Sequence, residues 1–314
     1  MLDGISLDQL RTFVTAVEEG SFSAAARKLR RVQSVVSQTV SNLEEQIGVA
    51  LFDRSERYPR LTPQGRALLA DARTIIAGIE GFKARAKGMA AGLEAELSVV
   101  VDVMFPIDFI AHAAQQFRLT YPNTPLRLYV EALGAAFAPV LDGRCGLGVV
   151  GPLPITPPSL TSEPLGSIKL VMVAAHNHPL ASFEGMIPRQ ELAKHVQLVL
   201  TDRSDLSAGR ELGVFSPLTW RLADLFAKHA FLLQGLGWGG MPAHTVKQDV
   251  AHGRLAVLSI EDVPANGLPV PMSVVYPSAS PPGPAGRWFV RFLQAQPPPP
   301  PHRPRTARVS RARS

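Results

Sequence analysis

Apolar residues near the N-terminus recur every three or four positions, which is the spacing of one face of an α-helix. A first helix is predicted over residues 6–18, because Ser6 and Gln9 match a capping box and Gly20 follows as a stop. Its predicted buried stripe is Leu10, Phe13, Val14 and Val17. A second helical pattern contains the three alanines of residues 24–26, whose small side chains let two helices cross closely.

The third helical pattern has two different faces. Its apolar stripe consists of Val36, Val40, Leu43 and Ile47. Its opposite face consists of Gln33, Ser34, Ser37, Gln38, Ser41 and Asn42. These short, uncharged donors and acceptors suit hydrogen bonds to base edges in a major groove, whereas an ordinary solvent-facing helix usually carries charged residues. A helix, a tight turn and a polar-faced helix predict a helix-turn-helix motif, in which the second helix enters the groove.

A charged hairpin is predicted directly after this motif. Residues 51–61 have apolar ends and a charged tip, as expected of a short wing. Arg54, Arg57 and Arg60 are predicted to contact phosphates or a minor groove. We therefore expect residues 1–62 to form a winged helix-turn-helix domain.

A longer helix is predicted from Pro63, because proline is well tolerated at the first position of a helix. Its apolar residues alternate spacings of four and three, which is a heptad pattern. They are Leu68, Ala72, Ile75, Ile79, Phe82, Ala86 and Met89. This stripe is expected to pair with a second copy of the chain, although it could instead pack against the chain's own domain. Residues 63–92 are thus predicted to be a linker and dimerisation helix that ends in a glycine-containing hinge.

The remainder of the chain alternates apolar runs with amphipathic helices, which predicts α/β lobes built on parallel sheets. The predicted strands are residues 97–103, 126–131, 146–151, 168–175, 197–200 and 272–276. Ligands of open α/β sheets bind at the carboxyl ends of strands, so we expect Asp102, Phe105, Leu133 and Gly134 to border a ligand cleft. Asp102 could equally cap the next helix, and Phe105 could belong to the core together with Met104. The glycine-rich run of residues 235–242 is predicted to be a turn into a helix whose backbone faces the cleft.

Composition and charge narrow the class of protein. The sequence is 46% hydrophobic and 18% charged, and it contains one cysteine, Cys145, so intramolecular disulfides and cysteine-rich metal sites are excluded. The net charge is +6, and five arginines that contribute to it lie in the Pro/Arg-rich segment 297–314. We expect this segment to be disordered, and to be either inert or a nonspecific DNA-binding arm. Residues 27–66 contain eight basic and four acidic residues, and this local excess supports DNA binding.

Other functional classes find no support in the sequence. No apolar run approaches the ~20 residues that span a membrane. The N-terminus also lacks the features of a secretory signal, so a cytoplasmic protein is expected. The eight histidines have no metal-ligand spacing, and no nucleophile elbow, phosphate-binding loop or catalytic triad is present. We therefore expect no enzymatic activity, no cofactor and no metal.

The N-terminal ninety residues resemble the winged helix-turn-helix of LysR-type transcriptional regulators. The resemblance rests on Phe13, Gly20–Phe22, Ala25–Ala26, Leu29, Gln33, Ser37, Leu43–Glu44, Gly48, Leu51–Phe52, Arg54, Leu61–Thr62 and Gly65. Arg31 and Val32 depart from the family pattern, which usually has an apolar residue followed by a capping Ser or Thr. Ser34 could cap the helix instead, which leaves open which of Gln33 and Ser34 contacts DNA.

The resemblance implies a two-lobed effector-binding domain over residues 93–296, similar to periplasmic solute-binding proteins. Lobe I would comprise residues 93–165 and 266–296, and lobe II residues 166–265, with a crossover near Thr201 and a return near Asn266. Thr201, Asp202 and Arg203 would then join the effector site, and Ser23 would join the DNA contacts.

The functional expectation is a homo-oligomeric regulator that binds double-stranded promoter DNA and responds to a small-molecule effector. It would act in the cytoplasm, associated with the nucleoid, and it would contact RNA polymerase. The alternatives are a solute-binding protein without a DNA function and an enzyme that uses the cleft. The arginines of the wing and the missing signal segment speak against the first, and the missing nucleophile and base speak against the second.

Overall fold

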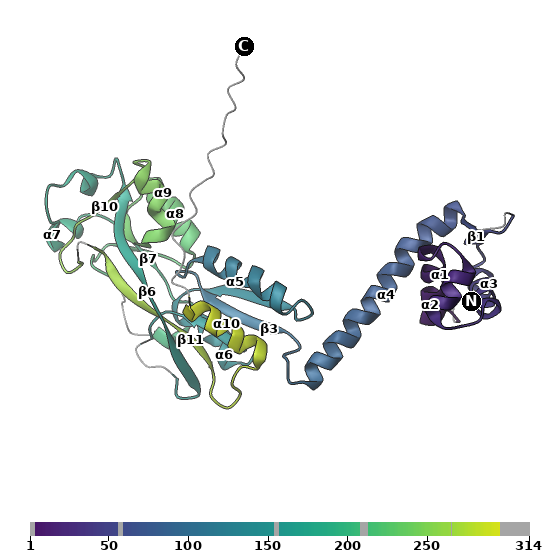
Figure 1. The fold of residues 1–314 in the computed structure, drawn as a ribbon. Helices are drawn as coiled ribbons and strands as arrows, with labels where there is room; N and C mark the ends of the chain where they lie inside the picture. Colours follow the sequence, from purple (N-terminus) through teal and green to yellow (C-terminus); the bar gives the residue numbers. More distant parts are fainter. Residues whose placement is uncertain (1–3, 56–58, 154–156, 208–212, 265, 296–314) are drawn as a thin grey trace, which may run out of the picture. The chain divides into compact units, whose positions relative to one another are not determined.

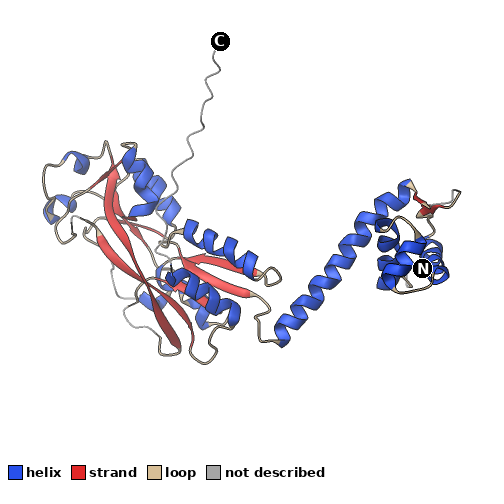
Figure 2. Cartoon of the chain, in the orientation of Figure 1, coloured by secondary structure: helices blue, strands red, loops and turns tan. Residues whose placement is uncertain are grey.

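The computed structural model describes residues 4–55, 59–153, 157–207, 213–264 and 266–295 (Figure 1). The chain divides into two compact units, residues 1–90 and residues 91–314. The first unit is mainly helical, and the second combines a sheet with helices (Figure 2). The predicted α/β class with a separate helical head is therefore confirmed. The segment 297–314, which we expected to be disordered, lies outside the described residues.

The first unit contains three short helices, a two-stranded hairpin and a long helix. Its elements are α1 (Leu7–Glu18), α2 (Phe22–Leu29), α3 (Gln33–Ile47), β1 (Phe52–Asp53), β2 (Arg60–Leu61) and α4 (Pro63–Ala90). The predicted capping box of α1 is confirmed, since the Ser6 side chain accepts from the Gln9 N–H and the Gln9 side chain accepts from the Ser6 N–H. Gly20 follows α1 with a φ of +71°, a left-handed conformation that glycine adopts at little cost.

The core of this unit is the set of apolar faces predicted from the sequence. Val36, Val40 and Leu43 of α3 are almost fully buried and pack with Phe13 of α1 and Ala25 of α2. The expected cap of α3 is wrong. Val32, not Ser34, occupies the position before the helix, and no side chain there bonds to the helix backbone. Because Val32 already has an extended conformation, Ser34 lies inside the first turn of α3, where it cannot act as the cap.

The apolar stripe of α4 is buried near the start of the helix and exposed further along it. Ala72 is 2% exposed and Leu68 is partly buried, and both pack against the core of their own unit. The expectation that Ala72 contacts a partner is therefore corrected, because its own domain already covers it. Further along the helix, Ile75, Phe82 and Met89 are 49%, 66% and 54% exposed.

The second unit is built on a nine-stranded sheet. Its strands are β3 (Leu97–Asp102), β4 (Leu126–Glu131), β5 (Leu147–Val150), β6 (Leu160–Ala175), β7 (Gln197–Leu200), β8 (Thr219–Leu222), β9 (Trp238–Pro242), β10 (Leu255–Val257) and β11 (Leu268–Pro277). Its longer helices are α5 (Ile107–Thr120), α8 (Leu225–Leu233), α9 (Ala243–Ala251) and α10 (Pro284–Ala295). Short helical turns are η1 (Leu133–Ala136), α6 (Ala138–Leu141), η2 (Pro179–Ser182), α7 (Arg189–Leu192) and η3 (Asp205–Ser207).

The strand order is β4-β3-β5-β11-β6-β9-β7-β8, with β10 paired to β6. The outer strands on each side are parallel to their neighbours, whereas β6 and β11 run antiparallel over ten residue pairs, from Leu170↔Leu268 to Leu160↔Pro277. The predicted parallel pairing is confirmed for the outer strands, whereas the central strands β6 and β11 depart from it. The part of β6 that pairs with β11, residues 160–170, is mostly half-buried or exposed, so it lacks a buried apolar run from which the pairing could be predicted.

Alternating residues of the strands supply cores on both faces of the sheet. In β3, Val99 and Val101 pack with α5 and α10, whereas Val100 between them packs with α6 on the opposite face. In β6, Val173 packs with residues of α8 and α9, whereas Met172 and Ala174 face a second cluster. Each half of the sheet is thus covered on both sides, so the unit has two lobes.

Two elements correct the predicted path of the chain. β6 is one continuous strand that pairs with β11 in one half and with β9 and β10 in the other, so the chain crosses between the lobes along β6. The expected crossover near Thr201 is wrong, because β7 before it pairs only with strands of the second lobe. The return after Asn266 follows β11, as expected. The glycine-rich run is a turn only at its start, where Gly235 has a φ of +72°. Its residues 238–242 form β9, and α9 begins at Ala243.

Candidate nucleic-acid interface and effector cavity

The polar face of α3 is directed to solvent. Gln33, Ser34 and Gln38 are exposed, and Ser37 is half-buried. The Gln38 Nε2 group donates to Asn42 Oδ1 over 2.7 Å, one helical turn away. This bond joins two amides on the exposed face and leaves the Gln38 carbonyl oxygen and one of its N–H groups for another partner. Ser23, the remaining predicted contact on the helices, is exposed in the first turn of α2.

The turn between α2 and α3 is held by local backbone geometry. Arg30 ends α2 in a left-handed conformation with a φ of +55°, which reverses the chain direction. Arg31 then pairs through both terminal nitrogens with Asp8 of α1, over 2.7 and 2.8 Å. This pairing lowers the pKa of the Asp8 carboxyl, chiefly through the hydrogen bond from Arg31. The turn thus fixes the start of α3 against α1.

The wing is attached to α3 through Glu44. Glu44 Oε1 accepts from the backbone N–H groups of Leu51 and Phe52, over 2.8 and 3.0 Å, and Oε2 pairs with Arg54 over 2.8 Å. Arg54 also lies over the Phe22 ring, 5.5 Å from its centre. Arg54 therefore has a structural role that the sequence analysis did not assign, since it fixes β1 to the helix-turn-helix.

Of the other two wing arginines, Arg60 is among the described residues and Arg57 is not. Arg60 begins β2 opposite Asp53 and is exposed. Arg57 lies outside the described residues. The base of the wing, which pairs Phe52 with Leu61, packs into the core through edge-on contacts of Phe52 with Phe13 and Phe22.

One exposed residue of α3 was missed in the sequence. Val35 is 44% exposed and lies next to Ser34 and one turn before Gln38, on the same solvent-directed surface. The sequence pattern assigned Val36 and Val40 to the buried stripe and assigned no role to Val35. An exposed apolar side chain on such a surface can contact the methyl group of thymine.

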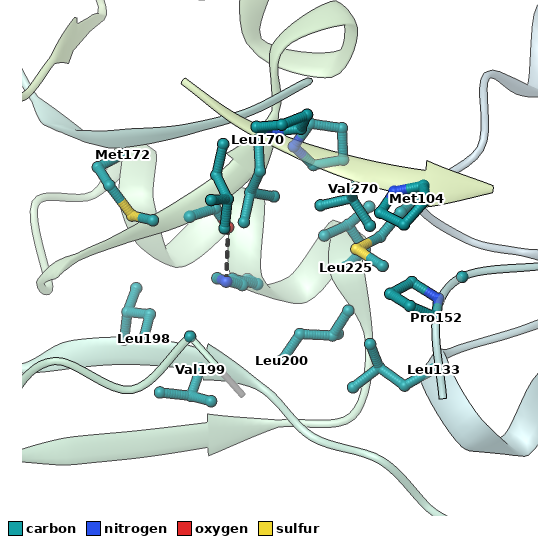
Figure 3. A pocket seen from close by; sticks show the side chains of 18 residues that line it. Met104, Leu133, Pro152, Leu170, Met172, Leu198, Val199, Leu200, Leu225 and Val270 are labelled. Carbon is teal, nitrogen blue, oxygen red and sulfur yellow. Dashed lines mark hydrogen bonds between the residues drawn. The ribbon is translucent and has the colours of Figure 1, made fainter. Parts of the chain in front are cut away.

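The second unit contains an apolar cavity of about 250 Å³ between its two lobes. Leu198, Val199 and Leu200 form one wall, and Leu170 and Val270 lie opposite them (Figure 3). Met104, Leu133 and Pro152 close the side that belongs to lobe I (Figure 3). Apart from backbone groups, the described residues that line the cavity include only one polar side chain, that of Lys228.

Lys228 was also missed in the sequence. It lies in α8 and is 4% exposed, and its Nζ group donates to the Gly240 carbonyl oxygen over 2.7 Å, the dashed line in Figure 3. Its burial lowers the pKa of the amine to about 8. The glycines of β9 admit this side chain: a Cβ on Gly239 would lie 2.4 Å from the Leu198 carbonyl oxygen and 3.3 Å from Lys228 Cε. Gly240 itself lines the cavity. The glycine-rich backbone therefore faces the cleft, as predicted, but it does so from strand β9.

Asp102, predicted as a ligand contact or as a helix cap, does not cap α5 and does not line the apolar cavity, but it borders a second, larger cavity. Its side chain is fully buried, and α5 begins after Pro106 without a side-chain cap. The carboxylate accepts from the N–H groups of Met104 and Leu133, over 2.8 and 3.0 Å. The contact with Leu133 holds that residue in a left-handed conformation with a φ of +54°, which is costly for leucine. Burial raises the pKa of Asp102 to about 6, against the lowering effect of its backbone hydrogen bonds.

Asp202 makes a similar set of contacts from the other lobe. It accepts from the N–H groups of Gly134 and Ala135, over 3.0 and 3.1 Å, and from Ser204. A Cβ on Gly134 would lie 2.3 Å from the Asp202 carboxylate, so this contact requires glycine. The hydrogen bond between the Gly134 N–H and the Asp202 carboxylate therefore connects the two lobes. Neither residue lines the apolar cavity.

The remaining predicted effector residues are distributed over two places. Leu133 lines the apolar cavity, whereas Phe105 and Arg203 border a larger, charged cavity of about 790 Å³. Phe105 is 4% exposed and belongs mainly to the core, and Arg203 pairs with Glu131 over 2.5 Å. Thr201 lines neither cavity, and its buried hydroxyl has no hydrogen-bond partner among the described residues.

No group of three or more His, Cys, Asp and Glu residues in the described ranges could hold a metal ion. None of the described helices combines the length and apolar character that crossing a membrane requires.

The chain matches two protein-family models. Residues 7–66 match the bacterial regulatory helix-turn-helix of the lysR family, and residues 90–298 match the LysR substrate binding domain. The two matches fall on the two units that the fold separates.

Individual proteins of known type give the same assignment. The chain is 31% identical over 274 residues to the probable HTH-type transcriptional regulator YhaJ of Escherichia coli K12, covering 82% of this chain and 87% of the relative. It is 29% identical over 259 residues to the transcriptional activator AllS of Klebsiella pneumoniae, covering 79% of this chain and 93% of the relative.

Among solved structures, the Corynebacterium glutamicum OxyR C206 mutant is similar, with a TM-score of 0.56, 26% identity and coverage of 92% of each chain. The fold is also shared with CrgA of Neisseria meningitidis, with a TM-score of 0.50, 22% identity and coverage of 93% of this chain and 99% of the other. Together with the two family matches, these similarities show that the chain belongs to the LysR family, as a DNA-binding transcriptional regulator with a C-terminal effector-binding domain.

Proposed function

We propose that α3 reads the operator of this regulator through its uncharged exposed face. The observation that carries the proposal is that Gln33, Ser34 and Gln38 are exposed while the opposite face of the same helix is fixed in the core. Such side chains can satisfy base-edge donors and acceptors, each well-made pair discriminating by about 1–3 kcal/mol. Ser23, Ser37 and the missed Val35 border this face, and Val35 would add contacts to thymine methyl groups.

The backbone of the duplex would be held by different groups. The N–H groups at the start of α3 have no side-chain cap, which leaves them available to a phosphate oxygen. Arg54, Arg57 and Arg60 of the wing would add positive charge near the backbone. Each phosphate neutralised in this way increases the salt dependence of binding, with a slope of about 0.9 on a log–log scale.

The regulator would act as a homo-oligomer paired through the distal part of α4. The exposed residues Ile75, Phe82 and Met89 are spaced by seven, with Ile79 and Ala86 between them, so they form one apolar stripe along the helix. A stripe with this period buries its apolar surface when it packs against a second helix. A dimer would present two copies of α3 to two half-sites of DNA.

The interlobe cavity would hold the small-molecule effector. A ligand that favours one arrangement of the lobes by ~1.4 kcal/mol changes the ratio of two assembly states tenfold. Transcription would then change because the regulator binds promoter DNA differently or contacts RNA polymerase differently. This activity would take place in the cytoplasm, at the nucleoid.

A gel-shift titration tests the central part of the proposal. The full chain is titrated against the duplex upstream of its own gene, and against a shuffled duplex of equal length and composition at the same salt concentration. We expect the upstream duplex to bind at least about a thousandfold more tightly, the lower range for specific over nonspecific binding. Equal affinity for the two duplexes would overturn the assignment of α3 as the reading helix.

A further inference from the structure

The interlobe cavity combines an apolar lining with one buried amine. Its described lining residues are leucines, valines, methionines, prolines and glycines, with Lys228 as the single ionisable side chain. Four of the lining residues are prolines: Pro152, Pro242, Pro269 and Pro271. A proline has no backbone N–H, so these parts of the wall offer no donor to a ligand. Lys228 is therefore the main hydrogen-bond donor among the side chains of this cavity.

The hydrogen bonds of Lys228 are incomplete. An ammonium group has three N–H donors, and among the described residues Lys228 makes one hydrogen bond, to the Gly240 carbonyl oxygen. No carboxylate forms an ion pair with it in the described part of the chain. A charged group buried without a partner of opposite sign is costly, and the cost falls when an anion enters the same low-dielectric space.

The surrounding charges do not fill this role. Four nearby charged or titratable residues all lie outside the lining of this cavity: Asp224, which caps the start of α8, His229 on α8, Arg221 on β8 and Lys169 on β6. His229 is engaged with Asp249, over 2.8 Å. The counter-charge for Lys228 would therefore have to come from a bound molecule.

From this geometry we infer that the effector is a compact, largely apolar monocarboxylate whose carboxylate pairs with Lys228. The inference rests on the proposed function of the cavity and specifies its ligand class. Two N–H donors of the ammonium remain, which matches the two oxygens of one carboxylate, whereas a phosphate would bring more acceptors and a second charge than this cavity can satisfy. The apolar walls then take up the rest of the molecule.

The size of the cavity limits the apolar part. An engineered apolar cavity of roughly 150 Å³ holds a benzene molecule. The cavity here, of about 250 Å³, therefore accommodates one ring with a short substituent, or a branched chain of similar size. Sugars, nucleotides and amino acids are disfavoured, because their many polar groups would find few partners on these walls.

Paired probes test the inference. The full chain is titrated by calorimetry with benzoate, phenylacetate and 3-phenylpropanoate, and with the three primary amides that have the same shape without the charge. We expect at least one acid to bind about tenfold or more tightly than its amide near pH 7. The affinity of that acid should fall by about tenfold or more between pH 7 and pH 9.5, because Lys228, with a pKa of about 8, loses its proton over this interval.

Variants assign the effect to Lys228. Lys228→Met keeps the length of the side chain without the charge, and Lys228→Gln keeps a donor for the Gly240 carbonyl oxygen. Both should bind acid and amide equally, and thermal unfolding verifies that they are folded. Lys247→Met, which removes an exposed lysine of α9, is the matched control and should keep the preference for the acid.

Three results would overturn the inference: no acid of the panel binds the wild type, acid and amide bind the wild type equally, or the preference persists in both Lys228 variants. None of these measurements contains DNA. A failure of the effector class is therefore distinguishable from a failure of operator recognition, which the gel shift reports separately.

Discussion

Gln38 and Arg57 have different proposed tasks at the DNA surface. Gln38→Ala would remove the proposed base-edge contact, so we expect it to weaken operator binding by about 1–3 kcal/mol and to leave binding to random duplex almost unchanged. Arg57→Ala would remove the proposed phosphate contact, so it should weaken both duplexes alike and lower the log–log salt slope by about 0.9 for each copy of the chain that binds. Fluorescence anisotropy titrations on both duplexes measure the two effects.

The control for these substitutions is Gln248→Ala, which removes an exposed glutamine from α9 in the effector-binding unit. It should change neither affinity. If Gln38→Ala and Arg57→Ala reduced operator and random binding in the same ratio, the division between base reading and phosphate contacts would be wrong.

The shifted pKa of Asp102 should make the free energy of unfolding depend on pH. Its pKa is raised from 3.8 to about 6 in the folded protein, so the folded state binds the proton more tightly than the unfolded state. The stabilisation is complete below about pH 4 and is lost as the pH rises through 6. Since Asn does not titrate, the difference in unfolding free energy between wild type and Asp102→Asn should shrink by roughly 3 kcal/mol from pH 4 to pH 7. Urea unfolding at several pH values measures it, and a difference independent of pH would contradict the burial of an ionisable carboxyl.

Single residues also show where sequence analysis reaches its limit. The exposed face of α3 could be predicted because burial there follows a local period of three to four residues. Lys228 could not, because its burial depends on Leu198 and Gly239, which come from strands 30 residues before it and 11 residues after it. Asp102 was recognised as a special acid, but its hydrogen-bond partner Leu133 lies 31 residues later, at the start of η1.

At the scale of elements, α4 makes the sharpest prediction. Phe82 is 66% exposed, so Phe82→Ser should not destabilise the folded unit, yet it removes the most exposed large residue of the apolar stripe. We expect sedimentation velocity to show a marked shift toward monomer at micromolar concentration. Lys83→Ser, at the exposed neighbouring position, is the control and should keep the oligomer. An unchanged distribution for Phe82→Ser would indicate that another surface holds the copies together.

Elements differ in how well their sequence patterns identify them. The helices α1, α3 and α4 were predictable because each has a clear amphipathic period. The glycine-rich strand β9 was misread as a turn, because glycine rarely favours a strand unless another backbone approaches closely, and here the Leu198 carbonyl does so. The long antiparallel pair of β6 and β11 was also missed, since the part of β6 that pairs with β11 is mostly half-buried or exposed and has no buried apolar run.

The whole molecule combines a helix-turn-helix, a long helix with an exposed apolar stripe and an apolar cavity in one chain. The family of the chain could be identified from the first ninety residues, because the helix-turn-helix pattern is local. The chemistry of the effector could not, because the residues that line the cavity are spread over residues 104–271 and come from several strands and helices.

Selection from a random duplex pool tests whether α3 reads DNA sequence in a paired molecule. The purified full chain is used to enrich bound duplexes over several rounds, and the products are sequenced. We expect an enriched motif with two related half-sites whose centres are about one helical turn, or a multiple of it, apart. Duplexes that bind without any common sequence would contradict it.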